Sequence, residues 1–361
     1  MKILLNMMKY DYGNVSQGFS FEYEVFGSVL KKIKDSEVEL FDYGEICKKG
    51  GTDKMNDLLV EKCKQFKPDL IFTFLFNNEI HLDTLDKIKK YSKASIIWMA
   101  DDKWRWKSMG KKYCHHFDYV ITTDPEAVKR YEGIGYHNVI LSQWGIDPEV
   151  FRKKKVEKDI DVSFVGRDNP WRRFVVKELR KLGINVKCYG FGWKNGRVTQ
   201  EKMVDIFNRS KVNLNLSNTV KFNLKYFLGI NFVWNKDISF ARNIYTVFGP
   251  QLHTVISKKR KEDIKARFFE VTGCGGFLLS YDVEYLDRYF EKGKEIVVYN
   301  ESIEEIYSKI IYYLENGEKR ERIALCGYEK TQRKHTYQDR FLSIFGKIGE
   351  NEPIFKNISF S

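Results

Sequence analysis

The chain has 361 residues, of which 43% are hydrophobic and 31% are charged. This composition is typical of a folded globular protein and argues against a disordered one, and no apolar run approaches the ~20 residues of a membrane-spanning helix. Residues 1–10 become polar too soon for a secretory leader, so we expect them to form a buried strand and the protein to be cytoplasmic.

The six cysteines lie far apart and form no Cys-x-x-Cys pair, which favours buried thiols over disulfides or a zinc site. The formal net charge is +13. Such a charge favours an anionic partner, namely nucleotide phosphates, an acidic membrane face, an anionic glycan or nucleic acid. A generally lysine-rich composition explains the same charge equally well, so the charge alone does not choose a partner.

In the first 150 residues, short apolar runs alternate with amphipathic stretches. Near-continuous apolar strands that alternate with helices predict a parallel sheet covered on both faces. We therefore expect a Rossmann-like domain over 1–150. Its predicted strands are 2–7, 38–41, 70–74, 95–99, 119–122 and 139–141, and its predicted helices are 22–34, 54–66, 82–91 and 125–132.

A highly charged stretch at 146–160 predicts a linker, after which the alternation begins again. We expect a second Rossmann-like domain over 151–345 and a tail at 346–361, with an aromatic-rich insertion at 218–261. The fold class is therefore α/β, with two domains built on parallel sheets. The predicted strands are 161–165, 186–189, 212–216, 276–280 and 295–299, and the predicted helices are 171–182, 200–208, 263–271, 283–291, 302–316, 319–334 and 336–348.

The first strand of the second domain ends in Gly166 and Arg167, just before a helix. Glycine lets backbone amides approach a ligand, a helix N-terminus is partly positive, and an arginine pairs with phosphate oxygens. Strand ends of this kind bind ligands in open α/β sheets. The corner therefore indicates a phosphate site, with an ordinary strand–turn–helix corner as the alternative.

Arg267 and Glu270 stand three residues apart on a predicted helix that ends in glycines and leads into an apolar strand. A carboxylate in this place can accept bonds from both ribose hydroxyls, while the neighbouring cation offsets diphosphate charge. The alternative is an ordinary surface ion pair.

The run RFFEVTGCGGFLL at 267–279 resembles the signature of CgeB-like (spore maturation protein B-like) glycosyltransferases. The resemblance covers most of the chain and is densest from about 160 to 345. Further matching segments are VSFVGR at 162–167, YGFGW at 189–193, TTDPEAVKRY at 122–131, LDRYFEKGKEIVVY at 286–299 and HTYQDR at 335–340.

This resemblance implies a GT-B fold, with two Rossmann-like domains facing a central cleft, related to the retaining glycosyltransferases of family four. In that group the second Glu of an E-x7-E pattern holds the donor ribose; it matches Glu270, and Glu262 stands eight residues earlier. We expect Arg167 and Arg267 to bind the diphosphate, which leaves as the bond to the sugar breaks. No metal and no cofactor besides the nucleotide-sugar substrate is expected, and UDP-sugars are favoured.

Two carboxylates, Asp101 and Asp102, end a buried strand of the first domain, at the edge expected to face the acceptor. We predict that one of them orients a sugar hydroxyl or the acceptor nucleophile, with helix capping as the alternative. Gly18, in the loop NVSQGFS at 14–20, is expected to approach the diphosphate, and a plain helix cap is equally consistent.

Four further candidates for donor binding follow strands of the second domain: Tyr189, Gly190, Asn215 and Ser217. The predicted reaction moves a sugar to a saccharide, a lipid-linked glycan or a protein, and peripheral contact with a membrane is compatible with it. Two alternatives are a phage-type DNA base glycosyltransferase, which the positive charge favours, and a binding module that takes nucleotide-sugars without turnover.

Overall fold

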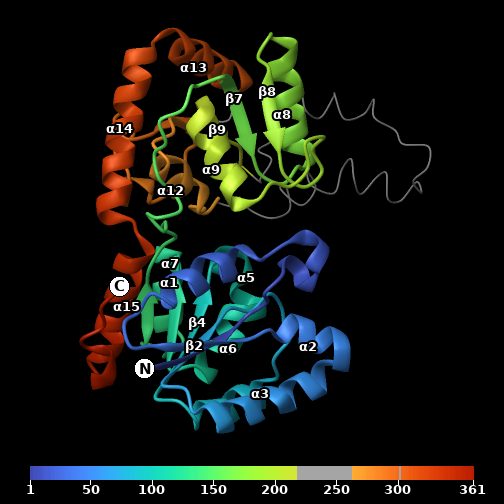
Figure 1. Cartoon of the computed structure of the whole chain (residues 1–361), viewed down its shortest axis with the longest axis vertical. Coiled ribbons are helices and arrows are strands. Elements are labelled where there is room, and N and C mark those ends of the chain that lie inside the picture. Colours follow the sequence, from blue (N-terminus) through green and yellow to red (C-terminus); the bar gives the residue numbers. More distant parts are fainter. Residues whose placement is uncertain (218–261, 301) are drawn as a thin grey trace, which may run out of the picture. The chain divides into compact units, whose positions relative to one another are not determined.

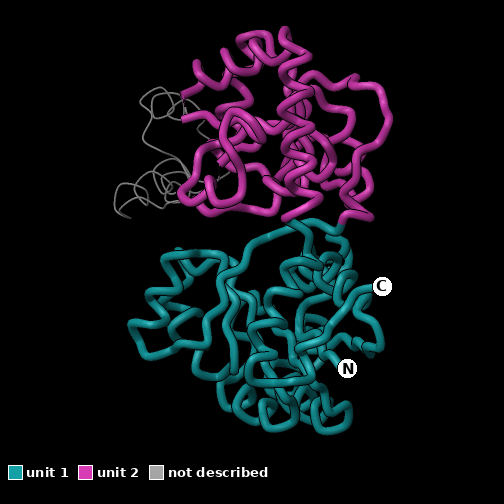
Figure 2. Tube along the Cα trace, turned by 90° about the vertical axis from the view of Figure 1, so that its left-hand side faces the viewer, with its two compact units in different colours: residues 1–147, 335–361 teal, residues 148–334 magenta. Residues whose placement is uncertain are grey.

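The computed structural model describes residues 1–217, 262–300 and 302–361, and the predicted insertion at 218–261 lies outside them. The chain divides into two compact units (Figure 2). Unit 1 comprises Met1–Asp147 and His335–Ser361, and unit 2 comprises Pro148–Lys334.

Unit 1 is built on a six-stranded sheet in the order β2-β1-β3-β4-β5-β6, in which every pair of neighbours is parallel. All six strands lie where the apolar runs predict them. Their bounds are β1 Lys2–Asn6, β2 Glu37–Phe41, β3 Leu70–Thr73, β4 Ala94–Met99, β5 Tyr119–Thr122 and β6 Val139–Leu141.

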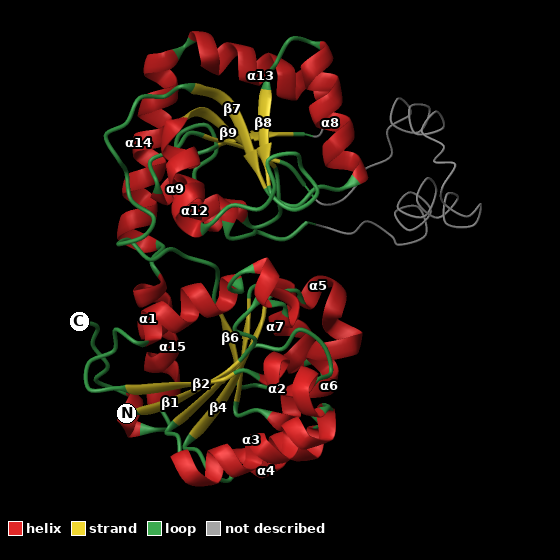
Figure 3. Ribbon diagram, turned by 45° about the vertical axis from the view of Figure 1, so that its right-hand side comes forward, coloured by secondary structure: helices red, strands yellow, loops and turns green. Residues whose placement is uncertain are grey.

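Helices cover both faces of this sheet, as Figure 3 shows. Successive strand residues point to opposite faces. Ile71 therefore packs into the core formed with α3 and α4, where Met55 and Leu85 are fully buried, whereas Phe72 lies 5.3 Å from the ring of Phe26 on the other face. The helices of unit 1 are α1 Ser28–Leu30, α2 Tyr43–Gly50, α3 Thr52–Phe66, α4 Leu82–Lys89, α5 Asp102–Arg105, α6 Lys111–Tyr113, α7 Pro125–Glu132 and α15 Tyr337–Gly349.

The C-terminal helix α15 belongs to unit 1, whereas residues up to 345 were predicted to belong to the second domain. Its Tyr337 and Phe341 rings lie 5.6 and 6.0 Å from the ring of Phe26, and Phe341 also lies 5.8 Å from Phe72. Burial of these four rings, each less than 2% exposed, favours this pairing. Position along the chain gave no indication of it.

Unit 2 contains a five-stranded parallel sheet in the order β11-β10-β9-β7-β8. The two sheets confirm the predicted α/β class with parallel strands. The strand bounds are β7 Ile160–Val165, β8 Val186–Tyr189, β9 Ser210–Asn215, β10 Leu278–Tyr281 and β11 Val297–Tyr299.

Local sequence explains where several helices of unit 2 begin. The side chain of Asn169 accepts the backbone N–H of Arg172 and Pro170 follows it, a combination that starts a helix. The prediction of a helix at 283–291 is wrong, because only a 3-10 turn, Leu286–Arg288, forms there. Tyr285, the residue before this turn, has a left-handed φ of 63°. The helices are α8 Pro170–Lys181, α9 Gln200–Arg209, α12 Arg267–Gly273, α13 Ile303–Glu315 and α14 Gly317–Lys334 (Figure 1).

Candidate functional site

The candidate donor site lies at the carboxyl edge of the sheet in unit 2. Because all five strands are parallel, their carboxyl ends meet at one edge. The first strand, β7, lies between β8 and β9, so the chain crosses to one side after β7 and to the other side later. Open α/β sheets bind ligands outside such a switch point. The predicted residues Gly166, Arg167 and Ser217 follow the two strands that flank it.

A buried arginine that the sequence analysis missed ties these two strand ends together. Arg172, in the first turn of α8, is 9% exposed. Its guanidinium donates to the backbone oxygen of Arg167 at 2.7 Å, to that of Leu216 at 2.7 and 3.1 Å, and to that of Ser217 at 3.1 Å. One side chain therefore fixes the backbone on both sides of the switch point.

The backbones that follow β7 and β8 approach each other closely. The N–H of Gly166 donates to the carbonyl of Tyr189 at 2.9 Å, and the indole N–H of Trp193 donates to the carbonyl of Gly166 at 2.9 Å. Gly190 has φ +126°, and a Cβ at this position would lie 2.2 Å from the carbonyl oxygen of Gly166. Only glycine therefore fits at position 190.

Gly190→Ala is expected to lower the free energy of unfolding by about 2 kcal/mol, because the added carbon forces the two backbones apart and strains φ. Gly196→Ala in the same loop is the control: its φ is +64° and a Cβ there meets nothing within 4 Å. We expect a loss of about 1 kcal/mol for the control. Urea unfolding measures both, and equal losses would contradict the steric explanation.

Arg167 is exposed, and its guanidinium lies 5.0 Å from the ring centroid of Phe191. Asn215 and Ser217, by contrast, are 6% and 1% exposed. The side-chain amide of Asn215 donates to the hydroxyl of Ser280 at 2.9 Å, and the backbone carbonyl of Asn215 accepts from the hydroxyl of Tyr299 at 2.7 Å. Of these three predicted residues, Arg167 is therefore the exposed one, whereas the side chains of Asn215 and Ser217 are buried.

Arg267 and Glu270 face each other at the start of α12. The guanidinium lies 2.6 Å from the carboxylate, and the side chains are 21% and 2% exposed, so this is a largely buried pair and not a surface one. The guanidinium also lies 5.0 Å from the ring centroid of Phe207. Burial raises the pKa of Glu270, and the positive charge of Arg267 opposes that rise. Glu270 therefore holds Arg267, which is the more exposed side chain of the pair and also contacts the sulfur of Met203 at 2.7 Å.

The buried Arg172 and the pair of Arg267 with Glu270 are close enough to act on each other electrostatically. Burial lowers the pKa of Arg172, and the positive charge of Arg267 lowers it further. Burial of positive charge at one sheet edge is costly unless an anion offsets it. Arg167, Arg172 and Arg267 thus place three guanidinium groups at this edge, of which that of Arg267 is paired with Glu270.

In unit 1, Asp102 is 1% exposed, and its carboxylate is hydrogen-bonded to neighbouring side chains. Its carboxylate accepts from the hydroxyl of Thr122 at 2.6 Å and from that of Tyr131 at 2.9 Å. Arg130 donates to its backbone oxygen at 3.3 Å. Burial raises the pKa of Asp102 to about 6. Asp101, the residue before α5, is partly exposed and is the better placed of the two to meet a substrate.

The raised pKa of Asp102 predicts a pH dependence of stability. The protonated Asp102 contributes to the free energy of unfolding below pH 3.8. This contribution is lost as the pH rises through about 6, because the folded protein then has to bury a charged carboxylate. We expect the stability difference between Asp102→Asn and the parent protein to shift in favour of the variant by roughly 2 kcal/mol from pH 4 to pH 7.5. Urea unfolding at both pH values measures it; parallel pH profiles would contradict the assignment.

Gly18 lies in unit 1, whereas the other predicted donor residues lie in unit 2. It is exposed with φ +76°, and a Cβ there would meet nothing within 4 Å. The helix that follows is capped by Ser20, whose hydroxyl oxygen accepts from the N–H of Tyr23 at 3.2 Å.

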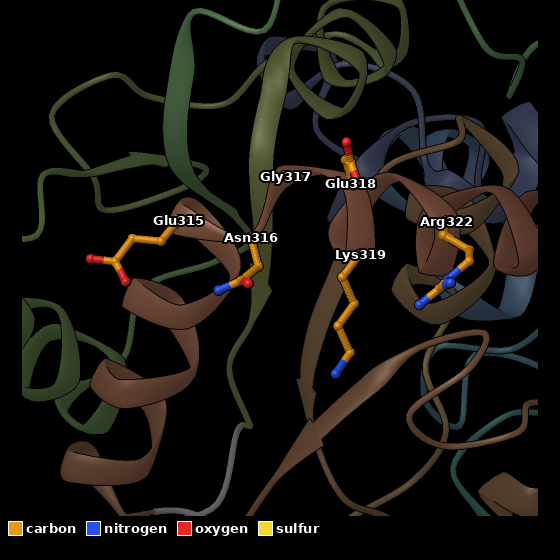
Figure 4. A pocket seen from close by; sticks show the side chains of 6 residues that line it. All are labelled: Glu315, Asn316, Gly317, Glu318, Lys319 and Arg322. Atoms are coloured by element: carbon orange, nitrogen blue, oxygen red, sulfur yellow. The ribbon is translucent and has the colours of Figure 1, made fainter.

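A surface cavity of about 670 Å³ lies where α13 ends and α14 begins (Figure 4). Because α13 starts just after β11 at the carboxyl edge and runs back along the sheet, its end lies at the opposite edge. This cavity is therefore separate from the candidate donor site. It is lined by Glu315, Asn316, Gly317, Glu318, Lys319 and Arg322.

Within residues 1–217, 262–300 and 302–361, no helix combines the length and apolar character needed to cross a bilayer. In the same ranges, no cluster of three or more His, Cys, Asp or Glu side chains is arranged to hold a metal ion.

Comparison with known proteins agrees with this arrangement. Residues 167–346 match a family described as glycosyl transferase-like. The spore protein CgeB of Bacillus subtilis (strain 168) is 20% identical over 294 residues, which cover 80% of this chain and 85% of CgeB.

Two solved structures share the fold over nearly the whole chain. HepE of Anabaena, solved in complex with UDP-glucose, has a TM-score of 0.63 at 10% identity and covers 97% of this chain and 100% of its own. Sucrose-phosphate synthase of Thermosynechococcus elongatus has a TM-score of 0.62 at 10% identity and covers 97% and 98%. The resemblance found in the sequence is thus confirmed: the chain belongs to the glycosyl transferase-like family, as a CgeB-like glycosyltransferase with the GT-B fold.

Proposed function

We propose that the enzyme transfers a sugar from a UDP-sugar to a saccharide acceptor, with retention of the anomeric configuration and without a metal ion. The observation that carries the donor class is the carboxyl edge of unit 2, where the exposed Arg167 and the pair of Arg267 with Glu270 flank a switch point held by Arg172. Fixed positive charge there stabilises a departing diphosphate as the glycosidic bond of the donor breaks.

The comparisons support UDP as the nucleotide. HepE was solved with UDP-glucose, TarM of S. aureus with UDP and a glycosylated glycerol, and the pneumococcal O-GlcNAc transferase GtfA with UDP and GlcNAc. The role of nucleotide-sugar binding falls to unit 2 and that of acceptor binding to unit 1. We place the reaction in the cytoplasm, which agrees with six free cysteine thiols.

The test is a panel of sugar nucleotides that contains UDP-glucose, UDP-galactose, UDP-GlcNAc, GDP-mannose and ADP-glucose. Thermal unfolding reports binding, since a ligand that binds only the folded state raises the melting temperature. Release of the nucleoside diphosphate reports turnover. We expect a UDP-sugar to give the largest shift and to be consumed equally with Mg²⁺ and with EDTA.

Acceptors are then added as oligosaccharides, lipid-linked glycans, glycoproteins and duplex DNA, and NMR of the product reports its anomeric configuration. Transfer to DNA alone would overturn the saccharide acceptor. Binding of UDP-sugars without consumption under any of these conditions would overturn the catalytic function and leave a nucleotide-sugar-binding module.

A further inference from the structure

Exposed aromatic side chains gather at the carboxyl edge of the sheet in unit 1. Tyr12, Phe76 and Trp104, which we call the aromatic row, are 52%, 39% and 53% exposed. They follow β1, β3 and β4, which are consecutive parallel neighbours in the sheet, so their loops leave the same edge. β1 and β3 also flank the switch point of this sheet, since β2 lies on one side of β1 and β3 on the other.

Contacts between the three loops join the members of the aromatic row. The rings of Tyr12 and Phe76 meet edge to face with centroids 4.8 Å apart. Arg105 donates a hydrogen bond to the backbone carbonyl of Phe76, and its guanidinium lies 5.4 Å from the ring centroid of Trp104. The three exposed rings therefore form one feature and are not scattered surface aromatics.

Buried groups of unit 1 fix the backbone that carries the aromatic row. The buried hydroxyl of Tyr43, a residue 1% exposed, donates to the carbonyl of Phe74 and accepts the N–H of Phe76, each at 3.0 Å. Tyr12 keeps a left-handed backbone, with φ 52° and ψ 28°, which costs about 1 kcal/mol for a residue other than glycine. Exposed rings that are anchored and strained bind a ligand with little further loss of conformational freedom.

Side-chain amides border the row. The amide oxygen of Asn14 accepts from the backbone N–H and the hydroxyl of Ser16 at 3.1 and 2.9 Å, and that of Asn78 accepts from the hydroxyl of Tyr113 at 3.4 Å. The bonds from Ser16 orient the amide of Asn14 through its oxygen, and the hydroxyl of Tyr113, which also lies 3.3 Å from the carbonyl of Ile80, contacts the amide of Asn78 through its oxygen. Their NH₂ groups are the donors that an incoming ligand oxygen would meet.

We propose that the aromatic row binds the acceptor as a saccharide chain, with sugar rings stacked on Tyr12, Phe76 and Trp104. This inference rests on the proposed function, because it assigns the acceptor of the same reaction. The C–H face of a pyranose is apolar and packs on an aromatic ring, while its hydroxyls accept bonds from groups such as the amides of Asn14 and Asn78. The row crosses three strands, about 10 Å, so it holds more than one sugar ring.

The composition of the edge favours a saccharide over a lipid surface. Membrane-binding faces combine basic residues with several inserted apolar side chains, aliphatic ones among them. Near the row only Val15, 66% exposed, is an exposed large aliphatic side chain among the residues that the structure describes in the loops after β1, β3 and β4. The side-chain amides of Asn14 and Asn78 can hydrogen-bond to the hydroxyls of a saccharide, whereas they do not favour insertion into lipid acyl chains.

The test measures binding of chitotetraose, cellotetraose, maltotetraose and a hyaluronan tetrasaccharide to the full chain by saturation-transfer NMR and calorimetry. We expect at least one to bind, and Phe76→Ala and Trp104→Ala each to weaken it roughly tenfold. Tyr312→Ala is the matched control: this ring is 43% exposed on α13 of unit 2 with Lys319 5.2 Å from its centroid, and its loss is expected to leave binding unchanged.

Three results would overturn the proposal: no tetrasaccharide binds, Phe76→Ala and Trp104→Ala bind as tightly as the parent, or the row variants instead lose binding to vesicles of phosphatidylcholine and phosphatidylglycerol. The thermal shift with UDP is recorded on the same samples. An unchanged shift with UDP alongside failed saccharide binding defeats the acceptor assignment alone, whereas saccharide binding without any response to UDP-sugars defeats the proposed function.

Discussion

Arg172→Met is expected to lower the free energy of unfolding by about 4 kcal/mol and to weaken the response to UDP. Methionine keeps most of the volume but removes four hydrogen bonds to the carbonyls of Arg167, Leu216 and Ser217. These buried acceptors then lose their charged donor, and the two strand ends at the switch point are free to separate. Urea unfolding and thermal shift with UDP measure the two effects.

Arg180→Met on the same helix is the matched control. Arg180 is exposed and donates to a single carbonyl, that of Val186, at 2.8 Å. We expect it to lose about 1 kcal/mol and to keep the full response to UDP. Arg172→Lys keeps a positive charge but lacks the forked guanidinium, so its free energy of unfolding should lie between those of Arg172→Met and the parent protein. Similar losses for Arg172→Met and Arg180→Met would refute the role of Arg172 at the switch point.

Arg267→Met is expected to lower the free energy of unfolding by about 3 kcal/mol, because it leaves the carboxylate of Glu270 buried without its partner. The double variant Arg267→Met with Glu270→Leu removes both charges and should recover most of that loss. Neither variant should show the thermal shift with UDP. The double variant thus tests whether the response to UDP is lost even when the free energy of unfolding is largely recovered.

The control for this pair is Arg209→Met, also in unit 2, which breaks ion pairs with Asp159 and Asp205 at the surface. We expect it to lose less than about 1 kcal/mol and to bind UDP normally. A full UDP response in the recovered double variant would show that the pair contributes packing and not donor recognition.

Much of this structure could be predicted from hydrophobic pattern. Buried parallel strands read as apolar runs, so all eleven strands of the described residues were predicted. Arg172 was missed because an arginine in the first turn of an amphipathic helix looks like any solvated one. Its only signal was its position shortly after Arg167 at the strand–loop–helix corner.

Other features depend on tertiary contacts that no local pattern carries. Asp102 follows a strand as a catalytic carboxylate does, yet Thr122 and Tyr131, distant in sequence, bury it. The periodicity at 283–291 suggests a helix, and the left-handed Tyr285 interrupts it. Helix α15 has an ordinary apolar face, and only the rings of Phe26 and Phe72 reveal where that face packs.

The return of residues 335–361 to unit 1 has a consequence for biosynthesis. A ribosome makes the chain from its N-terminus, so unit 1 stays incomplete until the last helix emerges, whereas every residue of unit 2 is available before that. The half that is translated second is therefore the first that can finish folding. A premature stop codon after residue 334 would leave the earlier half with an uncovered aromatic core and the later half intact.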